Sequence, residues 1–291
     1  MDNIEVSVIT PFYYGNEFIY RLAASINRSV SALQYQGDGA DVEWIIVNDS
    51  PGERVGELPD SEGLHVRIVS NDRNEGIHAS RVHGLSEAHG DYIVMIDQDD
   101  EIAADYLSVM LRTARSCPDA EAVVCNELVE EADGGVHKLY PRSSDLRRVT
   151  DFGYYLNVTN PIQTPGQCLI KSEAIPDAWK KRVISANGSD DLLLWLMMLT
   201  RGARFQAIPH CLVIHHHTGG NLSDSGAMIT QSSYEVAEIL LQEGFTEAGQ
   251  DRQLRRSISL GYAPRWRKAL NLKALAIKIG YRARAAFSDE L

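Results

Sequence analysis

The chain has 291 residues, of which 44% are hydrophobic, and a formal net charge of −12 at pH 7 with a pI near 5.2. This length and hydrophobic content permit a globular protein with a full core. The acidic balance argues against a nucleic-acid-binding protein, which usually presents a broad basic surface.

The N-terminal hundred residues alternate short apolar runs with helical periodicity. The predicted strands are Val6–Thr10, Trp44–Asn48, Val66–Ser70 and Tyr92–Ile96, and the predicted helices cover residues 17–33 and 76–88. Near-continuous apolar strands are typical of a mostly parallel sheet with helices on both faces, so we expect a Rossmann-like α/β fold. In such sheets ligands bind at the carboxyl ends of the strands, where this chain carries polar residues.

The second half of the chain is less regular, because Gly, Pro and Asp interrupt the pattern between about residues 126 and 164. Its predicted elements are helices over residues 104–116, 190–201 and 232–242 and strands over residues 122–125 and 205–208. We therefore expect one α/β domain over residues 1–225, more regular over residues 1–101 than over residues 102–225, and a helical, basic C-terminal extension over residues 226–291.

The C-terminal extension is basic although the whole chain is acidic. Between residues 251 and 287 ten Lys and Arg side chains accompany a single acid, Asp251, and Leu and Ile recur at helical spacing. Such a stretch can bind an anionic membrane surface, or it can be a solvated helix packed on the domain.

Three features of the sequence bear on where the protein works. The longest apolar run, Leu192–Leu199, is too short to span a bilayer. The N-terminus has no secretory signal, and the four cysteines lie without CxxC spacing, which favours reduced thiols over a zinc knuckle or a disulfide framework. The sequence thus predicts a cytoplasmic protein, either free or peripheral at the inner face of the membrane.

The strongest local signal is the acidic turn that follows the strand at residues 92–96. Asp97, Asp99 and Asp100 are three carboxylates within four residues, and clustered like charges cost free energy unless a cation offsets them. Carboxylate oxygens suit Mg²⁺ or Mn²⁺, which would bridge to a diphosphate. The alternative is a solvated, helix-capping turn without a ligand.

Other polar residues become candidates for the same site when they are considered together with this acidic turn. Asp49 follows another strand, so its carboxylate would project from the same edge of the sheet toward a nucleotide, although alone it fits an ordinary turn. Asp190 and Asp191 begin an apolar helix, whose dipole favours negative charge and where a carboxylate can also serve as general base for an acceptor hydroxyl. Residues 215–217 are histidines, of which one or two can face a common metal ion.

Taken together, these residues resemble the family 2 glycosyltransferases with the GT-A fold. The matching segments lie between about residues 4 and 224, and the ordered set is more specific than any single member. They are the run VSVITPFY from Val6, the turn at Asp49, the NEG segment from Asn74 with Arg81, the GDYI segment from Gly90 that leads into DQDD, and the Asp-Asp-helix and His segments.

The resemblance implies a nucleotide-sugar half over residues 1–101, an acceptor half over residues 102–225 and a role for each matching residue. The nucleotide-sugar donor would be bound by Pro11, Tyr13, Asp49, Asn74, Arg81, Asp97 and Gln98, with Tyr13 and Asp49 beside the base. Asp99 and His217 would hold Mn²⁺ or Mg²⁺, and Asp191 would be the catalytic base. The accessory residues would be Asp100, Asp190, His215 and Trp195.

The sequence departs from the family pattern at two positions that bear on donor choice. Asn48 stands where a second Asp is common, and Tyr14 stands where an Asn usually follows the tyrosine. No QxxRW motif lies near the Asp191 helix, which favours a single addition over processive synthesis.

The resemblance implies an inverting transfer from a UDP-sugar, or a dTDP-sugar, to a hydroxyl of a glycan or glycolipid, in surface polysaccharide or glycoconjugate synthesis. One alternative is a non-catalytic nucleotide-sugar or carbohydrate-binding module on the same fold. A nucleotidyltransferase is a weaker alternative, because the sequence has no GxxxxGK triphosphate loop.

Overall fold

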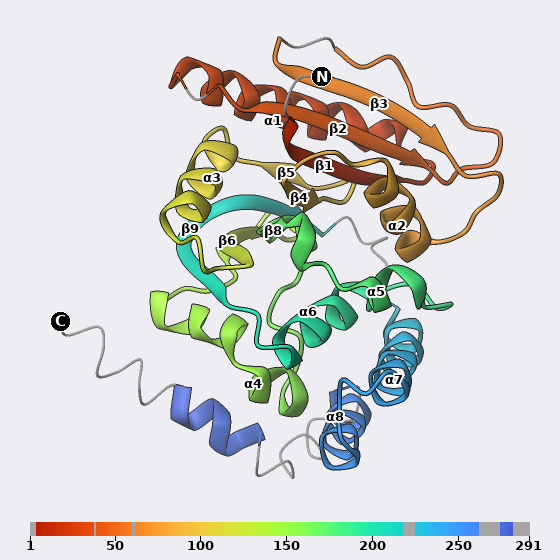
Figure 1. Ribbon diagram of the computed structural model, residues 1–291, viewed down its shortest axis with the longest axis vertical. Helices are drawn as coiled ribbons and strands as arrows, with labels where there is room; N and C mark the ends of the chain where they lie inside the picture. The colour runs from red at the N-terminus through yellow and green to blue at the C-terminus, as the bar shows by residue number, and fades with distance from the viewer. Residues whose placement is uncertain (1–3, 38, 60–61, 218–224, 262–273, 282–291) are drawn as a thin grey trace.

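A single sheet runs through both halves of the chain (Figure 1). The computed structural model describes residues 4–37, 39–59, 62–217, 225–261 and 274–281. Within these residues the nine strands of the sheet are β1 (Ile4–Phe12), β2 (Asp41–Asn48), β3 (Leu64–Ser70), β4 (Tyr92–Met95), β5 (Glu101–Ile102), β6 (Ala122–Glu130), β7 (Val136–Lys138), β8 (Cys168–Lys171) and β9 (Phe205–His216). Their spatial order is β3-β2-β1-β4-β8-β6-β9-β5, and β7 pairs with β6.

The N-terminal half of the sheet is parallel, as the sequence predicts. Strand β1 pairs in parallel with β2 and β4, and β2 pairs in parallel with β3. Strands covered on both faces need apolar side chains in both directions, which explains the buried run Trp44–Val47 of β2. In the second half β6 and β9 are parallel, whereas β8 is antiparallel to β4 and β6, and β5 to β9. The predicted α/β fold is confirmed, and its second half is a mixed sheet.

Strand β9 is much longer than the strand predicted at residues 205–208. It has 12 residues and pairs with β6 in two registers, which are offset between Val124 and Glu127 of β6. Pro209 lies in the stretch of β9 between the two registers, where a residue without an N–H is tolerated. The strand therefore continues beyond the proline and carries His215 and His216 to a position beside β5.

Helices cover both faces of the sheet (Figure 1). Helices α1 (Asn16–Tyr35) and α3 (Tyr106–Ser116) pack on one face, and α2 (Ile77–Glu87) and α6 (Asp190–Thr200) pack on the other. Side-chain alternation along β1 divides the two cores, since Val8 packs with α1 and α3 whereas Ile9 packs with α6. Gly84 lets α2 approach the sheet closely, because a Cβ at this position would lie 2.4 Å from Cγ2 of Ile9.

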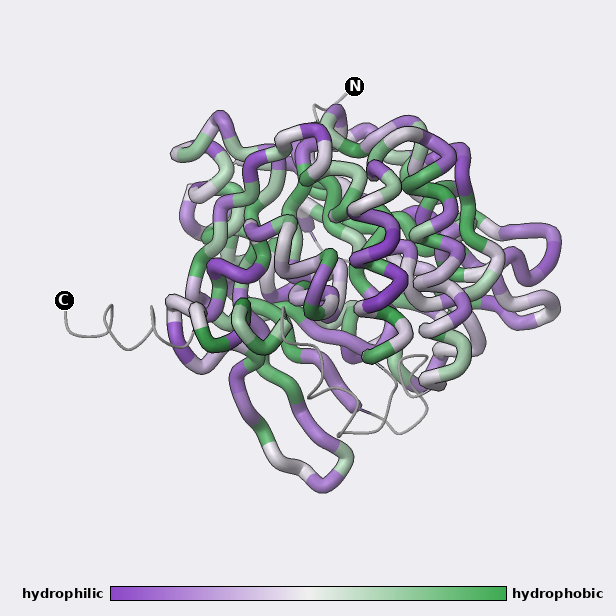
Figure 2. The backbone as a smooth tube through the Cα atoms, turned by 90° about the horizontal axis from the view of Figure 1, so that it is seen from below, coloured by the Kyte–Doolittle hydropathy of each residue, from purple (hydrophilic) through white to green (hydrophobic). Residues whose placement is uncertain are grey.

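The C-terminal helices pack on the second half of the domain. Helix α7 (Gly226–Gln242) lies against α6, and α8 (Ala248–Gly261) lies against α7 and α4 (Phe152–Asn157). The helix predicted at residues 232–242 is thus the C-terminal part of α7. The remaining described helices are α5 (Asp177–Lys181), the 3-10 helices η1 (Ser143–Thr150), η2 (Pro165–Gln167) and η3 (Ser172–Ala174), and a short helix over residues 274–281. In this last helix Tyr281 meets Tyr154 edge to face. Apolar segments run through the interior and polar segments gather toward the outside (Figure 2).

The basic tail falls only partly within the described residues. Arg252, Arg255 and Arg256 lie on α8, and Lys278 lies on the short helix over residues 274–281. The other basic positions of the tail, 265, 267, 268, 273, 282 and 284, lie outside the described residues, as does the Gly-Gly-Asn segment at 219–221. None of the described helices has both the length and the hydrophobicity that crossing a membrane requires.

Candidate active site

A cavity of about 1270 Å³ opens at the carboxyl ends of β1, β2 and β4. This is where a parallel sheet places the polar residues that follow its strands. All the predicted site residues except Asp100 and Trp195 line this cavity: Pro11, Tyr13, Asp49, Asn74, Arg81, Asp97, Gln98, Asp99, Asp190, Asp191, His215 and His217. Its volume exceeds that of most single-ligand pockets, so it has room for two substrates.

Two tyrosines after β1 form an exposed aromatic surface at one end of the cavity. Tyr13 and Tyr14 are each 49% exposed, and their rings meet edge to face with centroids 4.7 Å apart. Tyr14 adopts a left-handed backbone with φ of 45°, held by the hydrogen bond from its N–H to Oγ of Ser50 at 2.7 Å. Gln98 fixes Tyr13 by pairing its side-chain amide with the N–H and C=O of that residue. An aromatic face presented in this way can stack on a nucleotide base.

Asp49 shapes the loop before α2. Its carboxylate accepts hydrogen bonds from the N–H groups of Glu75 at 2.7 Å and Gly76 at 2.9 Å and from the side-chain amide of Asn71 at 2.8 Å. Gly76 has a φ of 90°, a backbone conformation that side chains disfavour. A carboxylate has about four lone-pair positions, so Asp49 keeps acceptor capacity for a ligand while it holds the loop that carries Asn74.

Asn48, which departs from the family pattern, has a structural role in the turn after β2. Its side chain donates to the carbonyl of Glu53 at 2.7 Å and accepts from the N–H of Ser50 at 2.9 Å. An aspartate here would lose the donated hydrogen bond. Asn48 therefore shapes the turn that carries Ser50, and Asn48 itself does not line the cavity.

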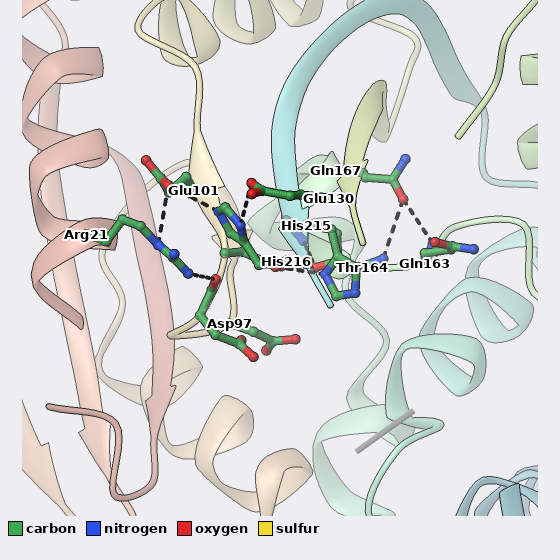
Figure 3. A network of polar contacts seen from close by, with 12 residues as sticks. Arg21, Asp97, Glu101, Glu130, Gln163, Thr164, Gln167, His215 and His216 are labelled. Carbon is green, nitrogen blue, oxygen red and sulfur yellow. Dashed lines mark hydrogen bonds and ion pairs between the residues drawn. The ribbon is translucent and has the colours of Figure 1, made fainter. Parts of the chain in front are cut away.

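The four residues of the acidic turn make different contacts. Asp97 forms an ion pair with Arg81, and Gln98 holds Tyr13. Asp100 is fully buried and accepts from Thr164 Oγ1 at 3.0 Å and from Nδ1 of His215 at 2.8 Å. Both partners, Thr164 and His215, are labelled in Figure 3. Asp99 lines the cavity. Asp100 therefore anchors the turn to the segment before β8 and to the end of β9, while Asp99 lies at the cavity.

Negative charge accumulates at Asp99. Burial and the neighbouring carboxylates of Asp100 and Asp97 raise the pKa of Asp99 to about 7. A bound cation would relieve this repulsion and keep the carboxylate ionised. The residues present therefore fit a divalent metal near Asp99, although no group of three or more His, Cys, Asp or Glu side chains in the described part of the chain is arranged as a complete metal site. Mg²⁺ commonly takes one or two protein carboxylates and completes its shell with water and substrate phosphate.

The three successive histidines at the end of β9 and just after it point in different directions. His215 and His217 line the cavity, with ring centroids 5.0 Å apart. His216 faces away and contacts Glu101 at 3.1 Å and Glu130 at 3.0 Å. Burial alone would lower the pKa of His215, but its hydrogen bond and charge interaction with Asp100 raise it to about 9. His215 is thus engaged within the protein, and His217 lies at the cavity surface.

The first turn of α6 places a second pair of carboxylates in the cavity. Asp190 is buried and bound by Arg81 at 2.6 Å. Asp191 accepts from the side-chain amide of Asn160 at 2.8 Å and from the N–H of Leu192 at 2.7 Å. Burial and the charge of Asp190 raise the pKa of Asp191 to about 7. A carboxylate of this kind has the proton affinity of a general base at neutral pH.

Two residues that shape the site were not predicted from the sequence. Asn160 contacts Asp191, and Thr164 binds Asp100. Helices α7 and α8 add Ser233, Leu254 and Ile258 to the cavity wall. Conversely, Trp195 lies in the core edge to face with Phe205 and does not reach the cavity, because α6 is buried on nearly all sides.

Residues 7–176, more than half of the chain, match the family described as Glycosyl transferase family 2. The chain belongs to this family. Among its curated relatives, the succinoglycan biosynthesis protein ExoO of Rhizobium meliloti is 25% identical over 221 residues, which are 70% of this chain and 60% of ExoO. A glucosyl-dolichyl phosphate glucuronosyltransferase of Haloferax volcanii is 31% identical over 122 residues, which are 41% of this chain and 37% of that enzyme. This family 2 chain thus spans less than two thirds of the length of the curated relatives it matches.

Solved structures agree on the fold of this family 2 member. Residues 1–349 of TarS from S. aureus, crystallised in complex with UDP-GlcNAc, superpose with a TM-score of 0.61 over 89% of this chain and 74% of that fragment. The sequence identity is 15%, so the similarity concerns the fold. The predicted GT-A arrangement is thereby confirmed.

Proposed function

We propose that the protein is an inverting glycosyltransferase that moves a sugar from a UDP-sugar to a hydroxyl of a glycan or glycolipid. One observation carries the proposal. A carboxylate suited to deprotonate an acceptor, Asp191, and the residues expected to bind the donor, from Tyr13 to Asp99, line the same cavity in a chain of family 2.

The donor end of the cavity favours a nucleoside diphosphate. The Tyr13 ring is exposed for stacking on the base, and Asp49 keeps an acceptor position for a base N–H. UDP is the preferred nucleotide because TarS, which shares the fold, was crystallised with UDP-GlcNAc, and dTDP is the alternative with the most similar base.

A divalent metal, Mn²⁺ or Mg²⁺, would neutralise charge on the departing diphosphate. Asp99 and His217 are the residues that would hold it, since both line the cavity and the neighbouring carboxylates of Asp97 and Asp100 add negative charge around Asp99. Asp100 and His215 keep the turn in place from behind.

The proposed reaction is a single displacement. Asp191 removes the proton from the acceptor hydroxyl as the oxygen bonds to the anomeric carbon, and the bond from that carbon to the diphosphate oxygen breaks. The electron pair of that bond leaves with the nucleoside diphosphate, so the configuration at the anomeric carbon inverts. Arg81 and Asn160 hold the α6 carboxylates in position during this step.

The acceptor would enter beside Asp191, where α4, α7 and α8 form the wall of the cavity. ExoO is named for succinoglycan biosynthesis and the Haloferax enzyme for a dolichyl phosphate acceptor, which supports a role in surface polysaccharide or glycoconjugate synthesis. We propose that the protein works at the inner face of the membrane, with the basic C-terminal segment in peripheral contact with anionic lipid.

The test is thermal unfolding with UDP, dTDP, GDP or CDP, each with and without Mn²⁺. A ligand that binds only the folded state at about 100 times its Kd stabilises that state by about 2.7 kcal/mol. We expect UDP to raise Tm with Mn²⁺ present and Asp99→Ala to remove the metal-dependent part of this shift. Stabilisation by none of the nucleotides would contradict the donor site.

A second measurement separates an enzyme from a binding module. Wild-type protein incubated with UDP-GlcNAc and Mn²⁺ should release UDP, by transfer or slowly by hydrolysis, and Asp191→Asn should bind UDP as well as wild type while it releases little. Binding without UDP release by the wild type, across acceptors, would favour the non-catalytic module.

A further inference from the structure

A buried arginine joins the two carboxylate pairs of the site. Arg81 lies on α2 and is 3% exposed. One terminal nitrogen, Nη1, lies 2.6 Å from Asp190 on α6, and the other, Nη2, contacts Asp97 in the acidic turn. The two carboxylates are 93 positions apart in the chain, so Arg81 links the nucleotide half to the acceptor half.

This geometry differs from that of an arginine free to bind phosphate. Both terminal nitrogens of Arg81 already contact protein carboxylates, and Nε has no hydrogen-bond partner among the described residues. Burial opposes its charge, but Asp190 and Asp97 raise the pKa of Arg81, which keeps it a cation. A planar guanidinium can hold two carboxylates in one fixed arrangement, which an ammonium cannot do.

We infer that Arg81 is a positioning residue rather than a ligand of the donor. It fixes the start of α6, and therefore Asp191, relative to the acidic turn that receives the diphosphate. This inference rests on the proposed function, because Arg81 would set the distance between the catalytic base, Asp191, and the diphosphate leaving group.

The charges around Asp191 support this role. Burial and Asp190 disfavour its ionised form, whereas Arg81, the N–H of Leu192 and the amide of Asn160 favour it. Tyr155 and Cys168 also face Asp191, and burial raises the pKa of both, so they remain neutral. His78 lies near Asp190 and burial lowers its pKa. Arg81 is therefore the cation that supports an ionised Asp191.

The two possible roles of Arg81 predict opposite kinetic results. A donor ligand would lose UDP affinity on substitution. A positioning residue would leave UDP affinity within about threefold of wild type, while kcat falls by about 100-fold, as expected for a reacting group displaced by about 1 Å. Removing the cation should also move the titration of Asp191 upward by about one pH unit.

The experiment uses the full-length chain with three variants. Arg81→Gln removes the charge, Arg81→Lys keeps the charge but not the two-pronged contact, and Arg112→Gln is the matched control on the exposed face of α3. UDP affinity is measured by calorimetry with Mn²⁺, and kcat and KM are measured by UDP release from UDP-GlcNAc. The Asp191 carboxylate is titrated by ¹³C NMR, assigned with Asp191→Asn.

We expect both Arg81 variants to lose kcat with UDP affinity retained, and Arg81→Gln to shift the Asp191 titration further than Arg81→Lys. If Arg81→Gln does not fold, the kcat and UDP affinity of Arg81→Lys alone decide between the two roles of Arg81. A tenfold or greater loss of UDP affinity with unchanged kcat would overturn the inference. If the wild type neither binds UDP nor releases it, the proposed function fails. The inference about Arg81 is then tested separately by the NMR titration, and an Asp191 pKa that is the same in the wild type and the Arg81 variants would overturn it.

Discussion

Asn160 provides the sharpest test of Asp191 as the base. Its side-chain amide donates to Oδ2 of Asp191 at 2.8 Å and stabilises the ionised carboxylate. A hydrogen bond to a charged group contributes about 1.5–3 kcal/mol, and 1.36 kcal/mol corresponds to about one pKa unit. Asn160 is half-buried, so water replaces part of the lost bond in Asn160→Ala. We therefore expect the pKa of Asp191 to rise by about half to one unit in this variant.

The expected loss of kcat in Asn160→Ala is larger at low pH than at high pH. A general base works when it is deprotonated, so activity increases as pH rises through the pKa of Asp191, which lies at about 7 in the wild type. In Asn160→Ala the acidic limb of the pH profile of kcat should shift to higher pH. We therefore expect kcat to fall by roughly three- to tenfold at about pH 6 and to be nearly unchanged at about pH 9. The assay is the initial rate of UDP release across this pH range with saturating UDP-GlcNAc and Mn²⁺.

Thr159→Ala is the matched control, because Thr159 lines the same cavity from the adjacent position. Its acid limb should coincide with that of the wild type. An Asn160→Ala profile with the wild-type midpoint, or with an equal loss at both ends of the range, would refute the reasoning and point to acceptor contact instead.

Two further predictions concern the nucleotide end and the sheet. Tyr13→Ala should weaken UDP binding by about tenfold, since stacking on a base contributes about 1–3 kcal/mol. The control is Tyr20→Ala, because Tyr20 is 48% exposed on α1, and it should leave UDP binding unchanged. Equal calorimetric Kd values for UDP in Tyr13→Ala and the wild type would argue against stacking. Glu43 is buried, and although burial opposes its charge, hydrogen bonds from Ser7 and His89 and the charge of Arg67 lower its pKa. Glu43→Gln should therefore lose about 1–3 kcal/mol of unfolding free energy in urea at neutral pH. The difference should narrow as pH falls through the lowered pKa of Glu43, whereas the exposed partner variant Glu87→Gln should show little change at either pH.

The predictable part of the fold consists of elements with a local pattern. The strands β1, β2 and β4 contain runs of buried apolar residues, and α1 buries apolar residues at helical spacing. Polar residues follow the ends of these strands. The positions of Asp49 and of the acidic turn at the cavity were predictable for the same reason, because these residues directly follow β2 and β4.

The parts that were not predictable depend on residues distant in the sequence. Strand β5 has two residues and exists because β9 pairs with it, and β9 itself continues past Pro209 only because β6 provides a second register. The contact of Thr164 with Asp100 joins residues 64 positions apart, and that of Asn160 with Asp191 joins residues 31 apart. No local sequence pattern identifies Thr164 or Asn160 as a partner of these carboxylates.

Trp195 illustrates the limit of transferring a role by resemblance. It stands at the position where the family pattern places a tryptophan near the base, but α6 is apolar on nearly every side and lies between the sheet and α7. A helix covered all round has no side facing a ligand beyond its first turn. Asp190 and Asp191 occupy that first turn, and Trp195 packs in the core.

The wall that α7 and α8 contribute to the cavity has a consequence for protein engineering. The family match ends at residue 176, whereas Ser233, Leu254 and Ile258 reach the cavity from beyond it. Because these side chains belong to helices outside the sheet, mutations there reshape one end of the cavity without moving the strand ends at the other. Under the proposed function, substitutions on α7 and α8 would change the acceptor end of the cavity and leave the donor end intact, so exchanging the two helices offers a route to engineered transferases.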